Sequence, residues 1–86
     1  MSGYRVLLQP AAARSLSGVP RDVQVRLKAA IVALGRVPRP HGCVKPSGAA
    51  DTWRVRVGSH RVVYVVDDTA RSVIVTVVGH RRDVYR

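Results

Sequence analysis

Acidic residues are scarce in this sequence: its 86 residues include five aspartates, no glutamate and fifteen lysines and arginines, for a net charge of +10. The aspartates are scattered rather than paired, which argues against a carboxylate metal site. Most of the basic residues are arginine, whose planar guanidinium binds phosphate through two parallel hydrogen bonds. The charge therefore predicts a polyanionic partner, with nucleic acid first and an acidic protein or an anionic membrane as alternatives.

A cysteine pair, a long apolar run and a signal peptide are also missing. Cys43 is the single cysteine, so the chain cannot form an internal disulfide. No apolar run approaches the ~18 residues of a membrane-spanning helix. The first ten residues lack the charged, apolar and small-residue segments of a signal peptide. We therefore expect a soluble, cytoplasmic protein with no membrane-spanning segment, and nucleic acid rather than a membrane as its partner.

Motifs for metals and cofactors are absent as well. His41, His60 and His80 have none of the spacings of metal-binding motifs, and Cys43 has no CxxC partner. There is no glycine-rich nucleotide-binding loop, and no serine belongs to a recognisable nucleophile, base and acid set. The sequence therefore predicts no metal, no small-molecule cofactor and no serine nucleophile.

The hydrophobic pattern that is present predicts one small domain spanning residues 1–86. Proline and glycine punctuation separates six elements: a strand at 4–9, helices at 10–17 and 20–34, and strands at 52–57, 60–67 and 72–78. This order predicts an α+β fold with an antiparallel-rich sheet of about four strands and two N-terminal helices packed on one face. The proline-bearing loop at 36–51 is a further place for function.

The hairpin WRVRVGSHRVVY, residues 53–64, raises a question about like charges. A two-residue turn at Gly58-Ser59 fixes the register, so that Arg56 faces Arg61 and both share a face with Arg54. Cross-strand like charges are destabilising. The functional interpretation is an anion clamp on this surface, which we call the arginine face; the structural alternative is that the side chains splay into solvent. The opposite face would carry Trp53, Val55, Val57, His60, Val62 and Tyr64.

The tail GHRRDVYR returns to the same end of the sheet. The loop DDTAR, between the strands at 60–67 and 72–78, sets which residues face each other. If this connection has two or four residues, Arg61 pairs with residue 78 and His80 lies on the arginine face. An odd-length connection places Arg81 there instead. Both residues remain candidates for the site.

The chemistry available suits cleavage of RNA without a metal ion. Such cleavage needs fixed cations around the phosphorane, a group that accepts the 2′-hydroxyl proton and a group that protonates the leaving 5′ oxygen. Arginine fills the first role but stays protonated. His60, His80 and Tyr85 are the candidates for proton transfer, with packing or capping as the structural alternative, and Tyr85 could instead stack on a base.

The segments WRVRVGSHRVVYVVDD and VIVTVVGHRRDVYR resemble the signature of the RelE/ParE toxin superfamily, and within it the RelE branch. The resemblance covers the whole chain. It implies a RelE-like fold and a ribosome-dependent endoribonuclease, an mRNA interferase that cleaves the A-site codon of mRNA on the 70S ribosome. By similarity, the products carry a 2′,3′-cyclic phosphate and a 5′-hydroxyl. The partner would be a cognate RelB-like antitoxin, which we expect to be acidic and amphipathic.

The resemblance also implies roles for individual residues. Arg61 and Arg81 would bind the scissile phosphate, and Arg81 would also be a candidate acid for the leaving group. Tyr85 would stack on the mRNA base or orient the 2′-hydroxyl. Arg54 and Arg56 occupy positions that are often lysine in the family, one of them a candidate general base, so their identity here raises the importance of the histidines. The expected RNA-binding residues around this catalytic set are Lys45, Arg82 and His60.

Two rival functions stay open. A ParE-type protein would inhibit DNA gyrase through protein contact without being an enzyme, and a catalytically weakened relative would act mainly through its antitoxin. The basic cluster together with a tail tyrosine is the feature that favours RNA cleavage.

Overall fold

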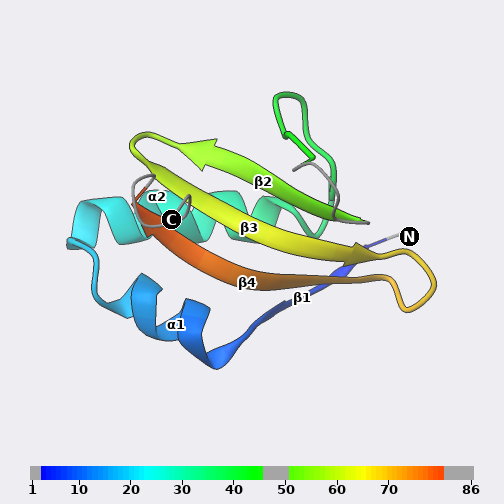
Figure 1. The fold of residues 1–86 in the computed structure, drawn as a ribbon, viewed down its shortest axis with the longest axis horizontal. Coiled ribbons are helices and arrows are strands. Elements are labelled where there is room, and N and C mark those ends of the chain that lie inside the picture. Colours follow the sequence, from blue (N-terminus) through cyan, green and yellow to red (C-terminus); the bar gives the residue numbers. More distant parts are fainter. Residues whose placement is uncertain (1–2, 46–50, 81–86) are drawn as a thin grey trace.

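The computed structural model describes residues 3–45 and 51–80, which form two helices and a four-stranded sheet (Figure 1). The elements are β1 (Arg5–Leu8), α1 (Pro10–Ser17), α2 (Arg21–Ala33), β2 (Thr52–Val57), β3 (His60–Asp67) and β4 (Ser72–His80). All six predicted elements are confirmed. Within the described part of the chain, no helix has the length and apolarity needed to cross a membrane.

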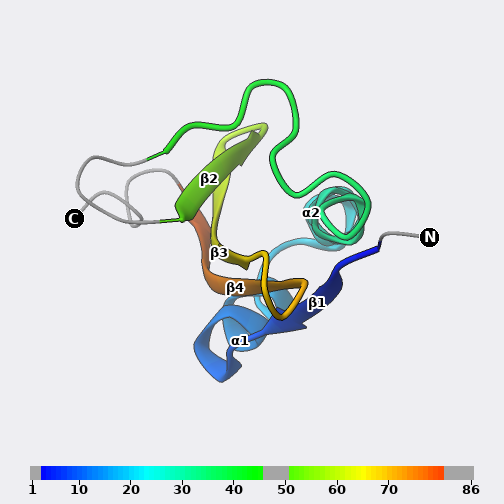
Figure 2. The ribbon, with the colours of Figure 1, turned by 90° about the vertical axis from the view of Figure 1, so that its right-hand side faces the viewer.

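The sheet has the strand order β1-β4-β3-β2. The β2–β3 and β3–β4 pairs are antiparallel, and β1 joins the sheet as a parallel partner of β4. The predicted antiparallel-rich α+β fold is therefore confirmed, with one parallel edge strand. Figure 2 shows the strands curving around α2, which lies inside the curve of the sheet.

Both helices follow from local sequence signals. Proline opens α1 at its first position, where the missing N–H would have no intrahelical partner, and Gly18 ends that helix. In α2 the apolar residues recur every three to four positions, so Leu27 and Ile31 are buried on one side. α1 packs against β4, and the two helices contribute to a single core with the sheet. The fully enclosed members of this core include Leu27, Leu34, Val62, Tyr64, Val66, Val73 and Val75.

A β-bulge in β4 changes the register that the loop length alone would set. The turn of residues 68–71 pairs Asp67 with Ser72, but the pairing then shifts between Val63 and Tyr64, so that Thr76 is the extra residue on β4. The Thr76 hydroxyl donates a hydrogen bond to the Val63 carbonyl, 3.2 Å away. Beyond this point every β4 side chain lies on the face opposite to the one expected without a bulge.

Candidate nucleic-acid interface

The hairpin between β2 and β3 has the predicted register. Arg56 faces Arg61, Arg54 faces Val63, and Trp53 faces Tyr64. Since Val62 and Tyr64 belong to the core under the helices, their neighbours of opposite parity lie on the other side of the sheet. Arg54, Arg56 and Arg61 therefore share the arginine face, away from α2.

The three guanidinium groups are held to different degrees. The Arg61 residue is only 9% exposed, whereas Arg54 is half-buried and Arg56 is exposed. The residue opposite Arg61 on β4 is Gly79, so no side chain stands across from it on that strand. A guanidinium enclosed in this way has few rotamers to choose from, which suits a fixed cation that stabilises developing charge.

The Arg56 side chain folds back along its own hairpin. Its Nε donates a hydrogen bond to the Gly58 carbonyl oxygen at 3.3 Å. Gly58 has a φ of 60°, the left-handed value that the predicted turn requires and that glycine adopts without strain. This hydrogen bond fixes the Arg56 side chain beside the turn.

A fourth guanidinium reaches the same turn from α2. The Arg26 Nη2 atom lies 3.5 Å from the position that a Cβ on Gly58 would occupy. In the sequence, Arg26 lies on the polar face of α2, which is typical of a solvated residue or a secondary phosphate contact. Only the fold shows that this residue packs against the hairpin turn, so the basic cluster extends around the end of the sheet.

His60 and His80 lie on the opposite side of the sheet from the arginine face. The bulge pairs His60 with His80 and Arg61 with Gly79, so the alternative that placed His80 among the arginines is wrong. The connection has four residues, one of the two even lengths that would place His80 among the arginines, but the extra residue in β4 reverses the parity. The register therefore gives no support to proton transfer by either histidine at the arginine face.

The loop after α2 carries Lys45 to the outer edge of β2. Val44 and Arg54 exchange two backbone hydrogen bonds, of 3.0 and 2.8 Å, which fix the backbone of Arg54 from the edge side. The Lys45 ammonium lies 5.9 Å from the centroid of the Trp53 ring. Lys45 therefore follows Val44, which is paired with Arg54. The described contact of the Lys45 side chain is with the Trp53 ring.

Carboxylates gather at the other end of the sheet. Arg39 makes two ion pairs of 3.0 Å, one with Asp51 and one with Asp68. The Tyr4 hydroxyl donates to Asp68 at 2.6 Å. Hydrogen bonds from Arg39 and then from Tyr4 hold the pKa of Asp68 below its ordinary value, and the bond to Asp68 raises the pKa of Tyr4. We call these four residues the Arg39 cluster.

The other aspartates of the described residues also have structural positions. Asp67 accepts a hydrogen bond from the Ala70 N–H at 3.0 Å and closes the β3–β4 turn. Asp22 lies in the first turn of α2, where a negative charge is favourable to the helix dipole. The scarce acids of the described chain thus support turns, a helix end and the Arg39 cluster.

The loop is anchored further by Tyr64 in the core. Its hydroxyl donates a hydrogen bond of 2.8 Å to the Pro38 carbonyl oxygen. Burial raises the pKa of this phenol well above its ordinary value, so it remains a donor throughout the physiological range. A side chain of β3 therefore anchors, at Pro38, the loop that leads to Lys45.

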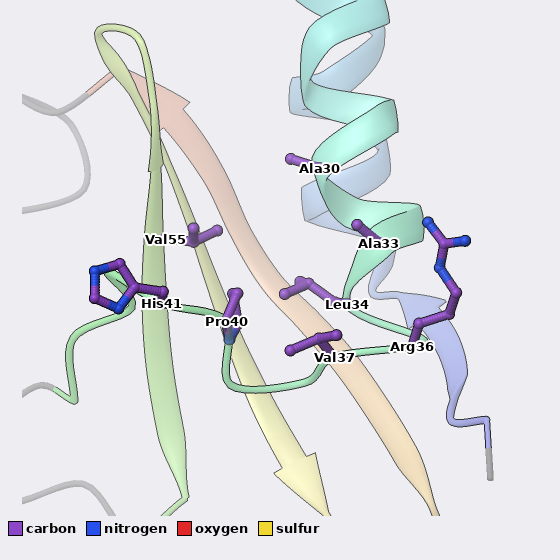
Figure 3. Close-up of a pocket in the computed structure, with 8 residues that line it drawn as sticks. All are labelled: Ala30, Ala33, Leu34, Arg36, Val37, Pro40, His41 and Val55. Carbon is purple, nitrogen blue, oxygen red and sulfur yellow. The ribbon is translucent and has the colours of Figure 1, made fainter.

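A groove of about 340 Å³ lies between α2, the loop and β2 (Figure 3). Ala30, Leu34, Val37 and Val55 direct their side chains into it, and Pro40 completes an apolar wall. Arg36 and His41 lie at its margin. The groove offers apolar contact rather than catalytic groups, and the sequence did not reveal it because its walls come from three separated segments.

Arg81, Arg82 and Tyr85 lie outside the described residues. The roles predicted for them stay predictions. The described part of the candidate site is the arginine face, with Arg26 at the turn and Lys45 near the opposite end of β2.

The fold and the basic hairpin belong to a recognised class of small proteins, the toxins of type II toxin-antitoxin systems. The family described as "ParE toxin of type II toxin-antitoxin system, parDE" matches residues 6–85. Because this match spans nearly the whole sequence, the chain belongs to that family, the RelE/ParE toxins.

Individual relatives include toxins of the RelE type. It is 33% identical over 84 residues to toxin RelG of Mycobacterium tuberculosis, with 96% of this chain and 97% of the relative covered. Its fold matches the toxin-antitoxin complex RelBE2 of M. tuberculosis with a TM-score of 0.81 and 28% identity, covering 94% of each chain. The intact RelBE complex of E. coli matches with a TM-score of 0.80 and 26% identity, covering 90% of this chain and 95% of that one.

Proposed function

We propose that this toxin is a ribosome-dependent endoribonuclease that cleaves mRNA in the A site. The observation that carries the proposal is the arginine face: a register that brings Arg54, Arg56 and Arg61 together on the side of the sheet away from the helices. The similarity to RelG and to RelE structures supports the same assignment. The cytoplasm, where ribosomes translate, is the proposed location.

The proposed reaction is attack of a 2′-hydroxyl oxygen on the adjacent phosphorus. The new P–O bond forms as the bond to the 5′ oxygen breaks, which leaves a 2′,3′-cyclic phosphate and, after protonation, a 5′-hydroxyl. The phosphorane formed on the way carries more negative charge than the diester, and Arg61 with Arg54 would stabilise it because they are already in place. No step uses a metal ion.

Removal of the 2′-hydroxyl proton is not assigned to the arginine face. Arginine stays protonated at neutral pH, so the described arginine face contributes charge and position rather than a general base. Tyr85 remains the proposed residue for stacking on the base or orienting the 2′-hydroxyl, and Arg81 remains the proposed second phosphate ligand and donor to the leaving group. Arg82 and Lys45 are proposed as contacts to the RNA backbone.

An in vitro translation reaction followed by primer extension tests this function. The wild-type protein should cut mRNA at the codon in the A site, and the cuts should fade in Arg61→Ala and Arg81→Ala. Arg14→Ala, a change on the exposed surface of α1, is the matched control for loss of one positive charge. Intact mRNA with the wild-type protein, under conditions where a RelE relative cuts, would refute the proposal.

A ParE-type gyrase inhibitor is the second candidate. The observation in its favour is that the description of the matching family names the ParE toxin. A supercoiling assay separates the two, since a gyrase inhibitor should block supercoiling and leave mRNA intact. A third outcome, no growth defect on expression without an antitoxin, would instead indicate a catalytically weakened protein.

The proposed partner in both cases is an acidic, amphipathic RelB-like antitoxin. The net charge of +10 favours an acidic segment, and the apolar groove beside α2 would accept its apolar side chains. Added salt should therefore weaken the complex, and more strongly the more charges are paired between toxin and antitoxin.

A further inference from the structure

The two histidines at the end of the β3–β4 ladder form a pair that the proposed function does not use. His60 and His80 are direct cross-strand partners, with ring centroids 5.6 Å apart and ring planes inclined at 76°. Both rings border a cavity of about 420 Å³ whose wall includes Ser15 and Gly18 at the end of α1. The pair is therefore close, directly opposed and next to an open space.

This pairing depends on the bulge. Without Thr76 as an extra residue, His60 would face Gly79, and the two imidazoles would lie on different faces. The sequence spacing of 20 residues gives no metal-binding signal, because the pair forms only through sheet register. Bulges commonly re-aim side chains at functional positions.

The geometry suits a single ion held between two imidazoles. Directly opposed residues of antiparallel strands have Cβ atoms about 4.5–5.5 Å apart, which lets both rings reach one ion at the usual distance of about 2.0–2.1 Å. Inclined ring planes allow the two nitrogen lone pairs to converge without contact between the rings. Imidazole is a preferred ligand of Zn²⁺, Ni²⁺ and Cu²⁺ and a poor one for Mg²⁺.

The surroundings both help and oppose a cation. The cavity lies at the carboxyl end of α1, where the helix dipole carries partial negative charge, and it has room for water molecules as further ligands. Arg26 lines the adjoining cavity with His60 and adds positive charge. Among residues 3–45 and 51–80, no third histidine, cysteine or acid joins the pair, so binding should be moderate rather than tight.

We propose that His60 and His80 form a two-histidine site for a transition-metal cation such as Zn²⁺ or Ni²⁺. The ion would join the first residue of β3 to the last residue of β4, on the side of the sheet away from the arginine face. It would act as a structural link and take no part in phosphodiester cleavage. Because it binds the folded chain, it should raise the melting temperature.

Isothermal titration calorimetry on tag-free full-length protein, at pH 7.5, tests the site with ZnCl₂, NiCl₂ or MgCl₂ alone. We expect one Zn²⁺ or Ni²⁺ per chain and no binding of Mg²⁺. The affinity for Zn²⁺ or Ni²⁺ should fall by at least about tenfold in His60→Ala and in His80→Ala, because each variant keeps only one of the two ligands. His41→Ala is the matched control, since His41 is exposed in the loop after α2. Arg26→Gln should bind somewhat more tightly.

A second measurement needs no variant. In NMR spectra of the wild-type protein, Zn²⁺ should perturb the imidazole signals of His60 and His80 together and leave those of His41 unchanged. Failure of Zn²⁺ and Ni²⁺ to bind, or binding that depends on His41 instead, would overturn the proposal. The result is independent of whether the protein cleaves RNA.

Discussion

The two ends of the sheet use arginine in opposite ways. At the end near the β3–β4 turn, Arg39 lies between two carboxylates and joins segments that are distant in sequence. At the hairpin end, register places Arg56 opposite Arg61 and beside Arg54, and Arg26 reaches the turn from α2. One end uses opposite charges to hold the chain together, whereas the other concentrates like charges on one surface. The first end therefore serves the fold, whereas the second is the surface that we propose for an anionic ligand.

Removing the enclosed guanidinium should have the largest effect. Arg61→Ala should lower the rate of mRNA cleavage by about 10²–10³-fold, the usual loss when a preorganised donor to the transition state is deleted. Primer extension over a time course measures the rate, with Arg61→Lys to retain the charge without the planar fork. Circular dichroism must show that both variants fold. A rate in Arg61→Ala within threefold of the wild type would contradict the assignment of the hairpin end.

An acid introduced on the arginine face should make the charge of the hairpin end more like that of the Arg39 cluster. Val77 is 40% exposed and is a diagonal neighbour of Arg61 on that face. Val77→Asp should reduce cleavage by about tenfold, because a carboxylate on a diagonal neighbour of Arg61 offsets the attraction of its guanidinium for phosphate. Val77→Asn has nearly the same shape without the charge and is the control. Equal losses in the two variants would point to packing rather than charge.

The opposite end should respond in stability rather than activity. Tyr64→Phe removes the hydrogen bond to the Pro38 carbonyl and should lower the free energy of unfolding by about 1 kcal/mol. Urea denaturation followed by circular dichroism measures the change, and cleavage should stay near the wild-type rate. A large loss of cleavage with unchanged stability would show that the loop contributes to the active surface directly.

The smallest expected effect is a pH dependence at the Arg39 cluster. The pKa of Asp68 is lowered in the folded state by hydrogen bonds from Arg39 and Tyr4, so its contribution to stability is present above the unfolded value of about 4. It is lost as pH falls through the folded pKa. Urea unfolding between pH 6 and pH 2.5 should therefore show a shallower decline in Asp68→Asn than in the wild type. Parallel declines would mean that the ionised Asp68 does not contribute to stability.

Local patterns predicted the elements and the hairpin well, for physical reasons. A two-residue turn leaves one register available, so Arg56 opposite Arg61 followed from Gly58-Ser59 alone. The period of α2 and its flanking prolines similarly set its position. These features depend on neighbours in sequence, which is why no tertiary information was needed.

The features that the sequence did not predict depend on contacts between residues that are distant in the chain. The bulge at Thr76 reversed the face of His80, and nothing in the alternation of SVIVTVV indicates an extra residue there. The Arg39 cluster joins Tyr4, Asp51 and Asp68, which meet only after the sheet has formed. The packing of Arg26 on the Gly58 turn has the same origin. The net positive charge predicted an anionic partner for the arginines. It did not show which arginine would instead form ion pairs with the aspartates of the chain.

The isolated bridge between Val44 and Arg54 bears on how free copies of the protein behave. Among residues 3–45 and 51–80, it covers the outer edge of β2 at one residue pair, while the strand continues beyond it to Val57 beside the exposed charge of Arg56. An uncovered strand edge can pair with another chain and begin aggregation, and charged side chains along the edge discourage this. The arginines would thus also keep separate copies from joining edge to edge, so a variant that loses them should be less soluble as well as less active.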